Sequence, residues 1–163
     1  MDRNACQPVS YSRSRFGTKL PAQMLYTASH FWLLEVDSET ESETESGQQA
    51  RVWRVGFTRF ATRMLGDLVE HDFEVQPGAE VTVGQTIGWV EGFKAASDLF
   101  CVVDGEFVRG NPALDHSIEL LSKDNYGEGW LYEVNGTPEP NAVDVNGYTG
   151  ILDAAIDKVQ GVE

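Results

Sequence analysis

Short apolar runs separated by turns and polar segments form the main pattern of this chain. Stretches rich in β-branched and aromatic residues, which favour strands, occur at residues 31–36, 51–55, 86–90, 99–103 and 130–134. Residues 51–55 also alternate polar with apolar positions, as a half-buried strand does. Further extended pieces are predicted from Leu68 and over 80–83. The chain is therefore expected to be mostly β.

Helical signals are fewer and lie between or after these runs. Thr58 is a suitable N-cap for a short helix that ends at Met64, because its hydroxyl can accept from an orphan backbone N–H. Pro112 begins a helical turn that carries apolar residues on one face. A C-terminal helix is predicted from a stripe of apolar residues at Ile151, Leu152, Ala155, Ile156 and Val159.

The remaining segments are expected to be turns or irregular. Tight turns are predicted at 77–78 and 104–105, and 135–147 is expected to be a loop. Residues 1–20 are expected to form an irregular arm before a single domain over 21–135, followed by a linker and helix over 136–163. Residues 37–46 alternate acids with hydroxyls and have nothing to bury, which predicts a solvated loop inserted in the domain and dispensable for folding.

Lys94 lies between two of the predicted strands, 86–90 and 99–103. Its neighbours are small or apolar, and no basic residue is close in sequence. The stretch 94–98 is therefore expected to be the tip of a hairpin that presents one ammonium group to solvent. An enzyme that modifies a lysine needs such an exposed side chain on a rigid turn, although an ordinary surface lysine would have the same local sequence.

Composition excludes several classes of partner. The 163 residues, 41% of them apolar, suit one globular domain with a real core. Twenty-six acidic against twelve basic residues give a net charge of −14, which disfavours nucleic acid and anionic membrane surfaces. Cys6 and Cys101 are far apart and predict neither a disulfide framework nor a zinc site. A cytoplasmic location is expected, with the mitochondrial matrix as a weaker alternative.

Candidate catalytic residues form no recognisable set. The three histidines, His30, His71 and His116, belong to different predicted elements and are expected to be packing or surface residues. Asp67 and Asp104 are near predicted turns, where aspartates are common because they bond to local backbone. A protein without its own active site is the preferred interpretation.

The surroundings of Lys94 resemble the H protein of the glycine cleavage system. The core of that family reads Glu-Ser-Val-Lys-Ala-Ala-Ser-Asp, and six of these eight residues recur here in register over 91–98. Further motifs that are similar to the family's and occur in the same order are Tyr-Thr at 26–27, Val-Gly-Phe-Thr at 55–58, Leu-Gly-Asp-Leu-Val at 65–69, Asn-Pro-Ala-Leu at 111–114 and Tyr-Gly-Glu-Gly-Trp-Leu at 126–131. The similarity covers roughly residues 24–134.

This resemblance implies a fold and a function. The family fold is a flattened β-barrel sandwich of the lipoyl/biotinyl-carrier type, and Lys94 would carry lipoate in amide linkage. Glu91 and Asp98 would orient the hairpin, while Ser29 and Asp98 would help to hold the loaded arm in a surface cleft. The implied partners are a lipoylating enzyme, glycine decarboxylase, aminomethyltransferase and dihydrolipoamide dehydrogenase.

Two departures from the family pattern affect these expectations. Gly92-Phe93 replaces the usual Ser-Val, which is expected to make the entry to the turn more flexible and to place an aromatic ring beside Lys94. Phe31 replaces a glutamate that in the family helps to hold the charged amine of the loaded arm. Because Phe cannot accept a hydrogen bond, we expect this chain to hold that amine more weakly.

Other functions remain open at the level of sequence. A lipoyl carrier could serve sulfur oxidation or lipoyl relay instead, and a protein of the same fold could be an unmodified binding module. A biotinyl domain is less favoured, because that family prefers Met on both sides of its lysine, where this chain has Phe93 and Ala95. An independent enzyme is the least favoured interpretation.

Overall fold

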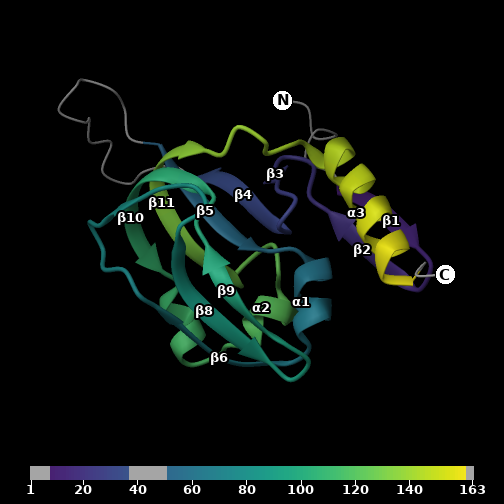
Figure 1. Ribbon diagram of the computed structural model, residues 1–163, viewed down its shortest axis with the longest axis horizontal. Helices are drawn as coiled ribbons and strands as arrows, with labels where there is room; N and C mark the ends of the chain where they lie inside the picture. Colours follow the sequence, from purple (N-terminus) through teal and green to yellow (C-terminus); the bar gives the residue numbers. More distant parts are fainter. Residues whose placement is uncertain (1–7, 37–50, 161–163) are drawn as a thin grey trace.

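A computed structural model describes residues 8–36 and 51–160 of the chain (Figure 1). The predicted loop at 37–46 and Cys6 lie outside the described residues. The strands are β1 (Val9–Arg13), β2 (Phe16–Leu20), β3 (Leu25–Tyr26), β4 (Phe31–Val36), β5 (Val52–Phe57), β6 (Leu68–Phe73), β7 (Glu80–Val81), β8 (Thr86–Gly92), β9 (Ala96–Phe100), β10 (Val103–Gly110) and β11 (Trp130–Pro138). The helices are α1 (Arg59–Leu65), the 3-10 helix η2 (Pro112–Asp115), α2 (Leu120–Lys123) and α3 (Val145–Gln160).

Two antiparallel sheets form the body of the molecule. One has six strands in the order β3-β4-β5-β11-β10-β7, and the other has three in the order β6-β8-β9. Apolar side chains from both sheets meet in one core, among them Val55 and Val134 from the larger sheet and Val90 and Leu99 from the smaller one. The predicted mostly-β sandwich is therefore confirmed.

A second apolar cluster lies beside this sandwich, between the β1–β2 hairpin and α3. It includes Phe16, Leu20, Tyr148 and Leu152, and Figure 1 shows the hairpin and α3 side by side at one end of the molecule. The predicted C-terminal helix is confirmed. The expected irregular arm is wrong for residues 9–20, because Phe16 and Leu20 bury their side chains against this cluster and so favour a paired strand.

Two glycine-containing dipeptides that predict turns instead lie inside strands. Gly105 in β10 pairs directly with Gly136 in β11. A Cβ atom at Gly105 would lie 2.0 Å from the Asn135 carbonyl oxygen, and one at Gly136 would lie 1.8 Å from the Asp104 carbonyl oxygen. The predictions of a turn at 104–105 and of a loop from 135 are therefore wrong. Glycine is required there because the two strands approach closely, and the chain does not reverse.

No helix in the described parts of the chain is long and apolar enough to span a membrane.

Candidate functional site

Lys94 lies at the tip of the β8–β9 hairpin, as the sequence predicts. The Gly92 N–H donates to the Ala95 carbonyl at 2.9 Å and closes the turn around Phe93 and Lys94. The side chain of Lys94 is exposed. The tip is shorter than expected, because β9 already begins at Ala96.

The connection between α1 and β6 holds this tip in place. The Lys94 N–H donates to the Leu65 carbonyl at 2.8 Å, and the Phe93 N–H donates to the Asp67 carbonyl at 2.9 Å. Both acceptors become available where α1 ends, at the C-cap residue Gly66. The backbone of Lys94, the candidate for modification, is therefore fixed by hydrogen bonds to a segment that is remote in sequence.

Two glycines allow this close contact. Gly66 has φ +78°, and a Cβ atom on it would lie 2.8 Å from Cγ of Lys94. A Cβ atom on Gly92 would lie 2.3 Å from the Leu65 carbonyl oxygen. The expectation that Gly92 makes the turn entry flexible is wrong, because its backbone is hydrogen-bonded and packed against α1. Lys94 therefore extends from a rigid base.

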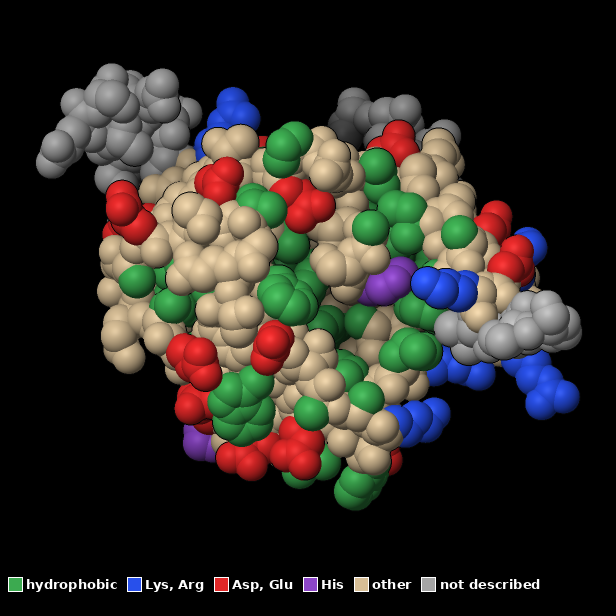
Figure 2. Space-filling view, viewed as in Figure 1, with side chains coloured by type: hydrophobic (Ala, Val, Ile, Leu, Met, Phe, Trp, Pro, Cys, Tyr) green, Lys and Arg blue, Asp and Glu red, His purple; other side chains and the backbone are tan. Residues whose placement is uncertain are grey.

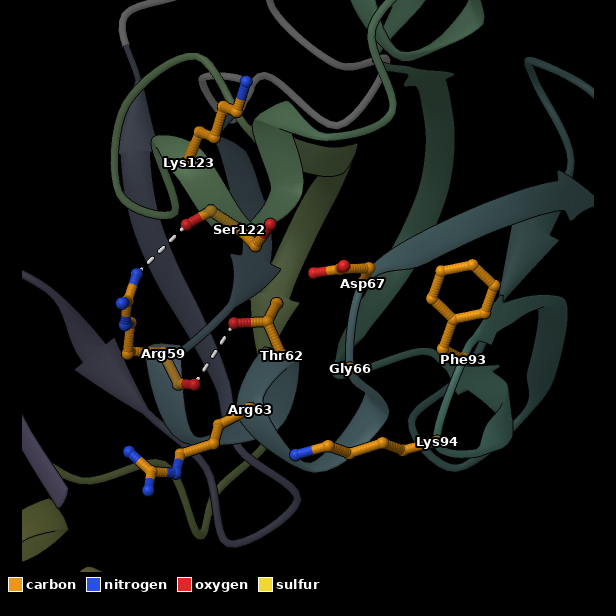
Figure 3. A pocket seen from close by; sticks show the side chains of 9 residues that line it. All are labelled: Arg59, Thr62, Arg63, Gly66, Asp67, Phe93, Lys94, Ser122 and Lys123. Carbon is orange, nitrogen blue, oxygen red and sulfur yellow. Dashed lines mark hydrogen bonds between the residues drawn. The ribbon is translucent and has the colours of Figure 1, made fainter. Parts of the chain in front are cut away.

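A cleft of about 770 Å³ opens beside the tip, between α1, α2 and the hairpin. Figure 3 shows the Lys94 side chain extended along it toward α1. The cleft is lined by Arg59, Thr62, Arg63, Gly66, Asp67, Phe93, Lys94, Ser122 and Lys123. Four of these residues are basic and one is acidic, although the chain as a whole is strongly acidic.

The basic residues of the cleft have no acidic partner within ion-pair distance among the described residues. The ion pairs found in residues 8–36 and 51–160 involve Arg13, Arg54 and Arg109 only. Arg59 instead donates to the Ser122 carbonyl at 3.2 Å, and the guanidinium of Arg63 lies 5.7 Å from the Phe16 ring centroid. In Figure 2, acidic side chains gather over β6 and β8, whereas basic ones lie toward α1 and the β1–β2 hairpin.

Of the other predicted site residues, Glu91 and Asp98 belong to the β8–β9 hairpin, whereas Ser29 does not. Glu91 pairs with Ala96, and Trp89 pairs with Asp98. Because side chains alternate along a strand, Glu91 and Asp98 lie on the same face of the hairpin, and both are exposed. Ser29 is exposed in the β3–β4 connection, where its hydroxyl lies 2.9 Å from that of Thr27. None of the three lines the cleft beside Lys94.

Phe31 is part of the sandwich core. Its side chain is 2% exposed, and its ring stacks on Phe57 at a centroid distance of 5.3 Å. The position that holds a cleft carboxylate in the resembling family is therefore occupied here by a buried ring.

Of the remaining titratable candidates, His71 and His116 line one further pocket, and the others are buried or make structural contacts. Burial lowers the pKa of His30 to about 4, and its Nδ1 lies 2.9 Å from the Tyr148 hydroxyl. Burial raises the pKa of the Cys101 thiol to about 11, so this thiol is protonated at neutral pH. Asp104 accepts from the Val83 N–H at 2.7 Å, which is a structural role. No cluster suited to a metal ion occurs among the described residues.

Comparison with known proteins defines the family. The sequence model of the family described as Glycine cleavage H-protein matches residues 34–147. A glycine cleavage system H protein from Corynebacterium jeikeium (strain K411) is 37% identical over 131 residues, covering 80% of this chain and 95% of the relative. One from Bacteroides fragilis is 37% identical over 138 residues, covering 82% of this chain and 98% of the relative.

A solved structure agrees with this result. The crystal structure of a glycine cleavage system H protein from Mycobacterium marinum superposes with a TM-score of 0.68 at 30% identity, covering 82% of this chain and 99% of that one. The fold is thus the lipoyl-carrier barrel sandwich that the sequence resemblance implies. The chain belongs to the glycine cleavage H-protein family, and the comparisons do not favour the other functions left open by the sequence.

Sequence reasoning missed the basic cleft. Arg59 and Arg63 are four residues apart, which places both on one face of a short helix. That spacing was an available signal. Nothing in the sequence, however, brings Lys123 or Lys94 next to that face, because α2 and the hairpin are remote from α1 along the chain.

Proposed function

We propose that this protein is the lipoyl-carrying H protein of a glycine cleavage system, with lipoate in amide linkage on Nζ of Lys94. The observation that supports it most directly is the exposed lysine on a hydrogen-bonded hairpin tip, in a chain of this family. Lys94 makes no ion pair with the described residues, so a modifying enzyme can reach Nζ without first breaking one.

The residues around Lys94 fit such a modification. The Nζ ammonium first gives up one proton, the neutral amine attacks the acyl carbon of an activated lipoyl group, the activating group leaves with its bonding electrons, and Nζ releases a second proton as the amide forms. The side chain thereby loses its charge next to Arg63 and Lys123, which relieves like-charge repulsion in the cleft. Gly66 and Gly92 keep the base of the side chain fixed.

The carried group would provide the redox and group-transfer chemistry, and the protein would position it. When bound, the lipoyl dithiolane would accept an aminomethyl group on one sulfur, and the dithiol left after transfer of that group would give up its reducing equivalents to the dehydrogenase. The partners would be the lipoylating enzyme, glycine decarboxylase, aminomethyltransferase and dihydrolipoamide dehydrogenase, in the cytoplasm. A tether anchored at one rigid point raises the effective concentration of its end at each partner's site.

Intact-mass measurement of protein made in a lipoate-supplied host tests this proposal. The wild-type chain should gain one lipoyl group, and Lys94→Arg should abolish the gain because an arginine cannot form that amide. Lys123→Arg is the matched control, since it changes the nearest other lysine of the cleft and should still gain one group. A lipoyl group on Lys19, Lys123 or Lys158 would contradict the proposal.

A further inference from the structure

Phe93 is the most exposed large apolar side chain among the described residues, at 80%. It immediately precedes Lys94, and its backbone N–H is bonded to the Asp67 carbonyl at 2.9 Å. Figure 3 shows its ring pointing in a different direction from the Lys94 side chain, although both residues line the same cleft. The ring is therefore presented to solvent from a fixed backbone, which makes it available to a partner at little cost in conformational entropy.

The cleft beside the same tip, which Phe93 also lines, concentrates positive charge. Arg63 and Lys123 line it, and neither forms an ion pair with a described residue. Outside this cleft the chain is dominated by its acidic residues, since the net charge is −14. An approaching protein with an acidic surface is thus repelled by most of this molecule and attracted to the cleft beside Lys94.

We propose that Phe93 and the basic cleft, here defined by Arg63 and Lys123, together form the recognition surface for the lipoylating enzyme. That enzyme would present an apolar recess to the Phe93 ring and acidic groups to the cleft. Aromatic anchors surrounded by complementary charge are the usual energetic centres of protein interfaces. The inference rests on the proposed function, because it needs Lys94 to be the acylated residue.

The position of the surface selects this partner among the four. A lipoylating enzyme must bring its active site to Nζ of Lys94 itself, so its surface has to cover the hairpin tip and the adjoining cleft. The later partners act at the far end of the arm, so their chemistry does not by itself require contact with the tip. Both recognition features therefore lie where only the first partner is obliged to bind.

The charge component is tested by the kinetics of lipoylation with purified protein, lipoate–protein ligase, lipoate and MgATP. The double variant Arg63→Gln, Lys123→Gln should lower kcat/KM about tenfold at low salt, and the difference should shrink below about twofold at high salt because charge attraction is screened. The matched control is Arg51→Gln, Lys158→Gln, which removes the same charge from exposed residues outside the cleft. It should change kcat/KM less than about twofold.

The contribution of the Phe93 ring is tested in the same assay. Phe93→Ala should lower kcat/KM about tenfold or more at every salt concentration, mainly through KM, because an apolar contact is not screened. Phe100→Ala is the control, since Phe100 is also an exposed aromatic residue of the hairpin, at 38%. It should leave kcat/KM within about twofold. Thermal midpoints of all variants confirm that the fold is intact.

The outcomes separate this inference from the proposed function. If the wild-type chain is lipoylated at Lys94 but the cleft and Phe93 variants react at the wild-type rate, the recognition surface is refuted and the proposed function stands. An equal loss in the charge-matched control would also refute the inference, because it would mean that only net charge matters. If the wild-type chain gains no lipoyl group, both fail together.

Discussion

Adjacent residues of β4 point into two different cores. Phe31 and Leu33 face the core between the two sheets, whereas Trp32 faces the cluster beneath α3. Each of the three side chains is at most 2% exposed. Because both faces of β4 are covered, this strand tolerates no polar side chain at any of these positions, including the one that holds a carboxylate in the resembling family.

A glutamate at position 31 should therefore destabilise the protein. Phe31→Glu would place a carboxyl group against Phe57 in the sandwich core, and burying an unpaired polar group costs about 2–7 kcal/mol. Chemical denaturation should show a loss of this order, reduced toward low pH as the carboxyl group protonates. Phe31→Leu, which stays apolar, should cost less than about 1.5 kcal/mol. A Glu variant as stable as the wild type would mean that position 31 can reach solvent.

At the scale of elements, α3 and the β1–β2 hairpin stabilise one another. Arg13 in β1 forms an ion pair with Asp157 in α3 at 2.9 Å, and the Tyr11 hydroxyl donates to Asp153 at 2.8 Å. These contacts are on the surface, so their net contribution is small. The main contribution comes from the apolar residues between the two elements, such as Phe16 and Leu152.

Truncation of Leu152, a core residue of α3, should test whether apolar packing makes the main contribution. Leu152→Ala removes a fully buried side chain and should cost about 2–5 kcal/mol in the free energy of unfolding. Ala154→Gly, an exposed change in the same helix, should cost only about 1 kcal/mol through helix propensity. Lipoylation of Lys94 should be unchanged in both folded variants, because the β8–β9 hairpin that carries Lys94 packs on α1 and not on α3. Equal costs for the two variants would contradict the buried role of Leu152.

At the scale of the whole molecule, three hydrogen-bonding groups connect the sandwich to α3. The Tyr148 hydroxyl of α3 lies 2.9 Å from Nδ1 of His30 and 2.8 Å from the hydroxyl of Thr58, the N-cap of α1. The His30 ring also packs against Phe60 at a centroid distance of 4.7 Å. Burial of His30 among these groups removes water from the ring and so disfavours its charged form.

This position should make the molecule less stable in mild acid. The pKa of His30 is about 4 in the folded chain and about 6.5 when unfolded, so the unfolded chain binds more protons between these values. The free energy of unfolding should therefore fall as pH decreases from about 6.5 to 4, by at most about 1.4 kcal/mol per pH unit from this residue.

The contribution of His30 to this pH dependence is measured by comparing the wild type with a variant that has no titrating group at position 30. His30→Asn keeps a residue that tolerates the positive φ of +72° but does not titrate. Its stability should decline less steeply than that of the wild type over this pH range, whereas His71 and Glu139, whose pKa values also shift, contribute equally to both proteins. Parallel pH curves for the two proteins would contradict the buried state of His30.

The local sequence determined those helices and strands for which the capping and periodicity signals agree with the packing in the fold. Thr58 caps α1 because its hydroxyl is the acceptor that a helix start requires, and its side chain does accept from the Ala61 N–H. The apolar stripe of α3 and the strand composition on both sides of Lys94 likewise depend on periodicities that a chain carries by itself. For this reason the sequence predicted the hairpin tip and its lysine without the fold.

Only the tertiary structure decided the features that depend on close approach between remote segments. Gly105 and Gly136 each resemble a turn residue, and their true role appears only when β10 and β11 pair. The β1–β2 hairpin forms because α3 covers it. The basic cleft exists because Gly66 and Gly92 let the hairpin dock on α1 and bring Lys94 beside Arg63, a proximity that no local pattern encodes.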